Sequence, residues 1–237
     1  MKMDIVIPTK GRDAQLGRLL ETIDENMITS IDKVAIYFDR PGDIVRFTPP
    51  KLRKCTMNRL DYRVIPRRPY KAPDLWNHHM GGMFADTMLT LSDDTELEKG
   101  ALRAAVNEYL MLWPNEYQGV LGLTQRNLEG KFDTAPAAFS IVGKGFQRHF
   151  INGLIWCPDY HFLYIDRELE MAARFHGVFQ FSTTAGLIHH HPCTGVPEDD
   201  TYRGIRKWKA ADQEMWRRRS TEGLIWGRDD VLLGREG

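Results

Sequence analysis

The feature that most limits the fold of this chain is a strand, a helix and a strand in succession at its beginning. Met3–Pro8 is apolar and predicts a strand, and Lys33–Phe38 predicts a second one. Between them, apolar residues at helical spacing predict an amphipathic helix over Arg12–Asn26. The apolar face of this helix consists of Leu16, Leu19, Leu20 and Ile23. This order predicts a βαβ unit, and therefore an α/β fold with a parallel sheet.

The same patterns predict the remaining elements. Further strands are expected at Tyr62–Ile65, Met88–Leu91, Gly119–Thr124, Phe139–Val142, Val178–Phe181 and Thr184–His190. Further helices are expected at Leu75–Phe84, Glu98–Trp113, Asp166 to about His176, and Asp199–Ser220. No linker separates the two halves of the sequence, which indicates a single domain over residues 1–237.

Polar residues follow several of these strands directly. Thr9–Arg12 follows the first strand, Asp39 follows the second, and Ser92-Asp93-Asp94 follows the strand at Met88–Leu91. In open α/β sheets the ligand cleft lies beyond the carboxyl ends of the strands. We therefore expect these three groups to meet at one edge of the sheet.

The Asp93-Asp94 pair has two interpretations. Adjacent carboxylates at the end of a buried strand repel each other, so a fold that keeps them usually provides a cation, and Mg²⁺ and Mn²⁺ prefer such oxygen ligands. Alternatively, Ser92, Asp93 and Asp94 are caps of a helix that begins directly after them. The convergence of the other strand ends favours the cation.

Composition excludes some classes of protein. The chain has 237 residues, a formal net charge of zero and 27% charged residues, so nucleic-acid binding would depend on local patches. Two basic clusters exist, Lys51–Lys71 and Arg203–Arg219, and the second also contains Trp208 and Trp216. Basic and aromatic residues together are typical of surfaces that bind phosphate backbones and bases, but also of solvated helix faces.

The location is predicted from what the sequence lacks. No apolar run approaches the roughly 20 residues that cross a bilayer, and charges and a proline interrupt the N-terminus too early for a signal peptide. The cysteines Cys55, Cys157 and Cys193 are scattered, which indicates reduced thiols. We therefore expect a cytoplasmic protein without a membrane span.

Four motifs together resemble the glycosyltransferases of the GT-A fold, most closely the family 2-like group. They are IVIPTKGR, the second strand that ends in Asp39, LSDD, and YIDREL followed downstream by His-x-His-Pro, in the same order over roughly residues 3–215. The resemblance implies a mostly parallel central sheet flanked by helices, in one domain. It implies a nucleotide-sugar half to about residue 125 and an acceptor half over about 126–237, ending in a basic helix.

The resemblance also implies an activity: transfer of a sugar from a nucleotide-diphosphate sugar, most simply a UDP-sugar, to an acceptor hydroxyl with inversion and with Mn²⁺ or Mg²⁺. Asp94 corresponds to the family's metal ligand. His189 and His191 lie on one face of a strand because its side chains alternate, and one of them would complete the coordination. Ser92 stands where the family has a further acid, so fewer ligands remain.

Donor binding is assigned to residues of the predicted cleft. An aspartate such as Asp39 can accept a hydrogen bond from the N3–H of uracil, Arg12 can contact a phosphate or the base, and Asp93 can hold sugar hydroxyls. The full set of predicted donor contacts is Pro8, Thr9, Arg12, Asp39, Asn77 and Asp93.

The acceptor side is assigned to the aromatic segment before the predicted helix at Asp166. Trp156, Asp159 and Tyr160 are the predicted acceptor contacts, with the aromatic rings stacking on sugar faces. Asp166 is the predicted base, and its alternative role is the helix N-cap. Glu168 remains a rival because Ile165 stands where the family often has glutamate.

Several alternatives remain open on sequence alone. The acceptor is either a saccharide or glycan, or a hydroxymethylated base in DNA of the kind modified in bacteriophage systems, in which case the location is the host cytoplasm. A Mg²⁺-dependent nucleotidyltransferase would use similar acidic strand ends, but Thr9–Asp13 lacks a glycine-rich basic loop. A non-catalytic sugar- or nucleic-acid-binding module would not explain Asp93-Asp94. The sequence predicts no oligomeric state.

Overall fold

The computed structural model describes residues 1–55, 57–65, 71–126, 132–133, 137–191 and 197–227. The strands are β1 (Met3–Thr9), β2 (Ile31–Phe38), β3 (Leu60–Val64), β4 (Thr87–Thr90), β5 (Thr95–Leu97), β6 (Val120–Arg126), β7 (Phe132–Asp133), β8 (Ser140–Gly143) and β9 (Phe179–His189). The α-helices are α1 (Asp13–Asn26), α2 (Pro41–Arg46), α3 (Ala72–Gly82), α4 (Ala101–Leu112), α5 (Ile165–Phe175) and α6 (Asp200–Thr221). Short 3₁₀ segments are η1 (Met57–Arg59), η2 (Lys144–His149) and η3 (Ile151–Gly153).

These strands form one mixed sheet with the order β3-β2-β1-β4-β8-β6-β9-β5, and β7 pairs with β6 outside this path. The strands β3, β2, β1 and β4 are all parallel, which confirms the βαβ unit expected at the start of the chain. Beyond β4 the pairing changes: β8 is antiparallel to both β4 and β6, and β5 is antiparallel to β9. The α/β class is confirmed. Parallel pairing is limited to the four neighbouring strands β3, β2, β1 and β4 and to the pair of β6 with β9.

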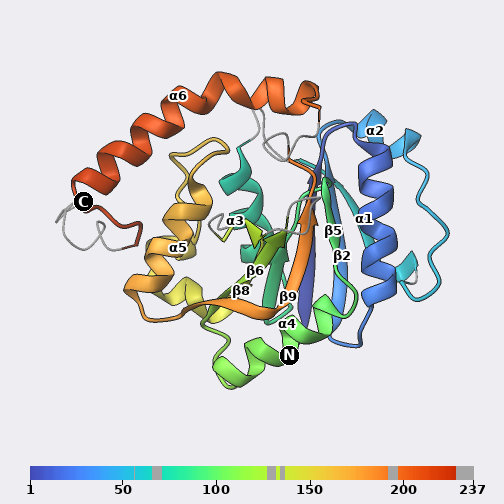
Figure 1. Cartoon of the computed structure of the whole chain (residues 1–237), viewed down its shortest axis with the longest axis horizontal. Helices are drawn as coiled ribbons and strands as arrows, with labels where there is room; N and C mark the ends of the chain where they lie inside the picture. The colour runs from blue at the N-terminus through green and yellow to red at the C-terminus, as the bar shows by residue number, and fades with distance from the viewer. Residues whose placement is uncertain (56, 66–70, 127–131, 134–136, 192–196, 228–237) are drawn as a thin grey trace.

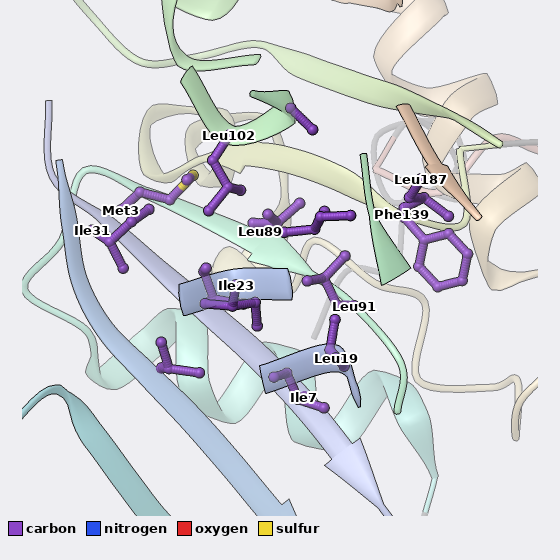
Figure 2. Close-up of a cluster of buried hydrophobic side chains, with 14 of the residues drawn as sticks. Met3, Ile7, Leu19, Ile23, Ile31, Leu89, Leu91, Leu102, Phe139 and Leu187 are labelled. Carbon is purple, nitrogen blue, oxygen red and sulfur yellow. The ribbon is translucent and has the colours of Figure 1, made fainter. Parts of the chain in front are cut away.

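Helices cover both faces of the sheet because the strand residues alternate between two apolar layers. In β1, the side chains of Met3, Ile5 and Ile7 pack in one layer with α1 and α4, and Val6 packs in the other with α3 and α5. Figure 2 shows the first layer, in which Leu19 and Ile23 of α1 meet side chains of the strands. The apolar stripe predicted for α1 is therefore buried as expected.

The segment after Asp94 differs from the prediction. A short strand, β5, follows Asp94, and the next helix, α4, begins only at Ala101 after Gly100. Gly100 has a φ of 84°, a left-handed conformation that favours glycine. Ser92, Asp93 and Asp94 therefore do not cap a helix, and the capping alternative is wrong.

The two strands predicted at Val178–Phe181 and Thr184–His190 are a single strand, β9. Its pairing with β6 shifts register between Gly122 and Thr124, so that Phe181 lies opposite Gly122 but Gly186 lies opposite Thr124. More residues of β9 than of β6 lie between these two pairs, so β9 is irregular here. This irregularity coincides with the gap between the two strands predicted from the sequence.

The helix α6 lies across the end of the sheet where the parallel strands finish, as Figure 1 shows in orange-red. Its buried residues are polar, Asp212 and Arg219. The Asp212 carboxylate accepts hydrogen bonds from the backbone N–H groups of His161, Phe162 and Leu163. Polar contacts therefore fix α6 together with the packing of its Met215 and Trp216 against a buried apolar cluster. Among the described residues, no helix combines the length and apolar character that a membrane span requires.

We predict that Asp212→Asn destabilises the protein by about 2 kcal/mol at neutral pH, because a buried charged acceptor is lost. Burial raises the pKa of Asp212, but the N–H groups of Leu163, Phe162 and His161 outweigh it and lower the pKa below its ordinary value. The stabilisation is thus present above the ordinary aspartate pKa of about 4 and disappears as the pH falls below it. Urea unfolding at several pH values measures this loss.

The matched control is Glu214→Gln, on the exposed surface of the same helix, which should leave the free energy of unfolding nearly unchanged. The account would be contradicted if Asp212→Asn and wild type had the same free energy of unfolding at pH 7. It would also be contradicted if the difference between their free energies of unfolding increased on acidification.

Candidate active site

A cleft of about 390 Å³ opens at the carboxyl ends of the parallel strands. Eight of the residues assigned from sequence line it together: Pro8, Thr9, Arg12, Asp39, Asp93, Asp94, His189 and His191. The expected convergence of three strand ends on one edge is confirmed. The expected alternation at the end of β9 is also confirmed, because His190 instead contacts Glu96 at 2.9 Å.

Asp93 is 3% exposed and is held from two sides. The Thr9 hydroxyl donates to its Oδ2 at 2.7 Å, and Arg12 Nη1 donates to its Oδ1 at 2.9 Å. Burial raises the pKa of Asp93 to about 6, although Arg12 lowers it. Each oxygen of the Asp93 carboxylate thus already accepts one hydrogen bond.

Asp94 is also buried, at 5% exposure, but it faces a different set of groups. Ser92 Oγ donates to its Oδ1, and His189 Nε2 lies 3.7 Å from the same oxygen. The Tyr202 hydroxyl of α6 donates to its Oδ2, and Arg12 Nη1 lies 3.3 Å from that oxygen. Burial raises the pKa of Asp94, but His189, Arg12 and Ser92 outweigh it and hold the pKa well below its usual range. Asp94 is therefore an ionised carboxylate.

Arg12 is the cation that this acidic strand end shares. Its Nη1 donates hydrogen bonds to Asp93 and Asp94. Its Nε and Nη2 donate to Asp199 at 2.7 and 2.9 Å. Its guanidinium also lies over the Tyr202 ring, 4.7 Å from the centroid. Burial lowers the pKa of Arg12, but Asp199, Asp93 and Asp94 raise it above its usual value. The predicted contact with a phosphate is thus replaced by contacts with three carboxylates.

Asp199 links this cluster to α6. It is the N-cap of α6, and its Oδ1 accepts from the N–H groups of Thr201 and Tyr202 at 2.9 and 3.0 Å. The same carboxylate binds Arg12 in a two-pronged pair. The beginning of α6 is therefore fastened over the cleft by the loop that follows β1.

The pair of Asp94 and His189 fits a divalent cation in part. Gln125 Oε1 can only accept, so His189 Nδ1 donates to it at 3.1 Å, and Nε2 is the ring nitrogen that faces Asp94. A carboxylate with an imidazole suits Mn²⁺ better than Mg²⁺, which prefers oxygen ligands alone. Within the described ranges no group of three or more His, Cys, Asp or Glu side chains is arranged for a metal. The substrate or water would have to supply the remaining ligands.

The opposite side of the cleft is apolar and aromatic. It is lined by Trp76 of α3, by Trp208 of α6 and by Phe162, which lies in the segment before α5. The Trp208 ring stacks on His161 with centroids 3.9 Å apart and an interplanar angle of 8°. This wall provides flat surfaces on which a sugar ring or a base can stack.

Four predicted contacts lie away from the cleft lining. Trp156 and Tyr160 are buried in the core, at 2% and 0% exposure, so they cannot stack on an acceptor in this conformation. Asn77 exchanges hydrogen bonds with the backbone of Trp156, at 2.7 and 3.1 Å, and so supports this segment instead of a nucleotide. Asp159 is exposed and is absent from the lining. These assignments are corrected to structural or surface positions.

The two candidate bases differ in their surroundings. Glu168 is 1% exposed and accepts from Arg219, from the Trp226 N–H and from the Tyr160 hydroxyl, so it is not available to take a proton. Asp166 is half-buried in the first turn of α5 and accepts from the Arg167 N–H at 3.0 Å.

The helix N-cap is Tyr164, not Asp166, so the alternative role proposed for Asp166 is wrong. Burial raises the pKa of Asp166. Asp166 is not part of the cleft lining, although Phe162 and Leu163 just before it are.

Several cations of the two basic clusters are paired with acids or bound to backbone carbonyls among the described residues. In the first cluster Arg63 pairs with Asp61, and Arg59 and Lys54 donate to backbone carbonyls near the end of α1. Arg67 and Arg68 lie outside the described residues. In the second cluster the ion pairs are Arg203–Asp200, Arg206–Glu198, Arg217–Glu214 and Arg219–Glu168. These ion pairs reduce the charge that the two clusters could offer to a phosphate backbone.

Sequence reasoning missed the contribution of α6 to the cleft. Tyr202 and Lys207 line it, and Asp199 holds Arg12, but the pattern of α6 indicated only a basic and aromatic helix. Lys10 was likewise passed over between Thr9 and Arg12. The available signal was the N-cap sequence Asp199-Asp200-Thr201, which fixes where α6 begins.

The fold can be compared with solved structures. It is similar to S. aureus TarS 1-349, with a TM-score of 0.60 and 14% identity over 80% of this chain and 60% of that chain. For the complex of TarS 1-349 with UDP-GlcNAc the TM-score is 0.59, with 12% identity over 90% of this chain and 66% of that chain. The chain spans 36% of the longer TarS structure. TarS is a GT-A-type glycosyltransferase.

The chain has the GT-A fold. This likeness confirms the fold implied by the sequence motifs. No protein-family model matches the sequence, and no curated protein is detectably similar to it.

We predict that Arg12→Ala lowers the free energy of unfolding by about 3–5 kcal/mol, because Asp93, Asp94 and Asp199 lose their shared cation. Thermal and urea unfolding measure the loss. The matched control is Arg18→Ala, which removes an exposed pair with Glu96 and should change stability by less than about 1 kcal/mol. Equal stabilities of the two variants would show that Arg12 does not hold the acidic cluster together.

Proposed function

We propose that the protein is a glycosyltransferase that moves a sugar from a UDP-sugar to an acceptor hydroxyl with the help of a divalent cation. The observation that carries the proposal is the buried Asp93-Asp94 end of β4, beside His189, in a cleft of the GT-A fold. Solved structures of TarS, which has this fold, contain UDP and UDP-GlcNAc. The cleft here lies at the same kind of strand edge that binds nucleotides in α/β proteins.

Each cleft residue has a chemical role in this proposal. Asp39, half-buried beside Pro8, accepts the uracil N3–H. Asp94 and His189 hold the cation, which when bound stabilises the negative charge on the departing diphosphate. Arg12 keeps Asp93 and Asp94 ionised and in place. Asp166, which is outside the cleft lining and three residues after the lining residue Leu163, takes the proton of the incoming hydroxyl, so that displacement occurs in one step with inversion.

The aromatic wall favours a saccharide acceptor. Trp76, Phe162 and Trp208 offer apolar faces for sugar C–H groups. A DNA acceptor would need accessible cations along the path of its phosphate backbone, and several described cations of the two basic clusters are already held in ion pairs. A DNA base bearing a hydroxymethyl group therefore remains the second candidate.

The scattered cysteines, of which Cys55 and Cys157 are free, support a cytoplasmic location.

We predict that calorimetry detects UDP binding in the presence of Mn²⁺, and that EDTA or Asp94→Asn weakens it at least about tenfold. The matched control, Asp32→Asn, lies at the start of β2, at the opposite end of the strand from the cleft, and should bind UDP normally. Release of free UDP from a panel of UDP-sugars tests the reaction. Release of pyrophosphate from a nucleoside triphosphate and a sugar phosphate would instead support a nucleotidyltransferase.

We predict that Asp166→Asn lowers turnover about 100-fold or more while the affinity for UDP is unchanged. Burial raises the pKa of Asp166, so on acidification this base becomes protonated at a higher pH than an ordinary aspartate does. Turnover should therefore begin to decrease at that higher pH as the solution is made more acidic. Steady-state rates across pH measure both effects. The control is Glu170→Gln on the same helix, which removes a contact with Arg174. Near-normal turnover of Asp166→Asn would remove it from the mechanism.

A further inference from the structure

The cations of the cleft fall into two groups. Arg12, Lys10 and Lys207 all line it. The Arg12 guanidinium is 8% exposed and is bound to Asp93, Asp94 and Asp199. Four of its five N–H groups are thus already directed at these carboxylates.

The two lysines have a different environment. Both are exposed, and neither forms an ion pair among the described residues. The Lys207 ammonium lies 4.9 Å from the centroid of the neighbouring Trp208 ring. A ligand could therefore bind both lysines without breaking an ion pair among the described residues.

The two lysines come from different elements and both lie beside the first turns of α6. Lys10 lies in the loop between β1 and α1, and Lys207 lies on α6. Lys10 Nζ lies 3.7 Å from the position that a Cβ of Gly204 would occupy. Gly204 and Lys207 are three residues apart and therefore lie on one face of α6. Two ammonium groups thus face the same part of the cleft, an arrangement that attracts an anion.

We propose that Lys10 and Lys207 bind the diphosphate of the donor, while Arg12 acts as a positioning residue for the acidic cluster. This inference rests on the proposed function, because the anion is taken to be that of a UDP-sugar. The loop after β1 and the first turns of α6 then close on the diphosphate from two sides. Lysine suits this task because its ammonium is a compact charge on a flexible stem.

The test is calorimetry of UDP and of uridine, in Mn²⁺ buffer, with Lys10→Ala, Lys207→Ala and the double variant. Each single variant should weaken UDP binding about tenfold and the double variant about 100-fold. Uridine lacks the diphosphate, so its affinity should be the same in all variants. The dependence of UDP affinity on NaCl should become shallower in the double variant.

The controls separate charge from structure. Lys209→Ala removes an exposed cation on the same helix that does not line the cleft, and it should bind UDP as wild type does. Lys10→Arg and Lys207→Arg keep the charge and should retain most of the affinity. Thermal unfolding should show equal stability for all of these variants.

The outcomes distinguish this inference from the proposed function. If wild type binds UDP and both alanine variants bind it within twofold of wild type, the lysines do not bind the diphosphate. If the variants lose UDP and uridine equally, their effect is structural and the inference is also overturned. If wild type binds neither ligand, the proposed function fails and this inference fails with it.

Discussion

The structure depends on one buried guanidinium. Arg12 joins the end of β1, the Asp93-Asp94 end of β4 and the Asp199 cap of α6, three parts of the chain that are distant in sequence. Its removal would leave several carboxylates close together in a largely buried site. The repulsion expected of adjacent acids is therefore partly relieved inside the protein, where one guanidinium contacts all three carboxylates.

This arrangement changes what the acidic pair implies. From the sequence, two neighbouring carboxylates were an argument for a metal. In the structure the Asp93 carboxylate already accepts hydrogen bonds from the Arg12 guanidinium and from the Thr9 hydroxyl. The case for a cation rests instead on Asp94 and on His189, whose Nε2 faces Asp94 while Nδ1 contacts Gln125. Asp93 and Asp94 thus have separate tasks, one structural and one directed toward a ligand.

Local patterns predicted the parts of the fold and site that depend on short stretches of chain. The βαβ start, the polar strand ends and the shared face of His189 and His191 follow from periodicity and alternation. The contact of Arg12 with Asp199 joins residues 187 positions apart, and no local pattern contains it. Burial of Trp156 and Tyr160 was missed for a related reason, since an aromatic loop segment has the same composition whether it covers a core or contacts a ligand.

The central claim is that Arg12 holds the acidic strand end and α6 together while Asp94 and His189 receive the ligand. A crystal structure of the protein with UDP and Mn²⁺ tests it most directly. The account predicts Mn²⁺ between Asp94 and His189, uracil at Asp39, and Arg12 still bound to Asp93 and Asp199. Nucleotide bound outside this cleft, or Arg12 turned onto the phosphates with its contact to Asp199 broken, would contradict it.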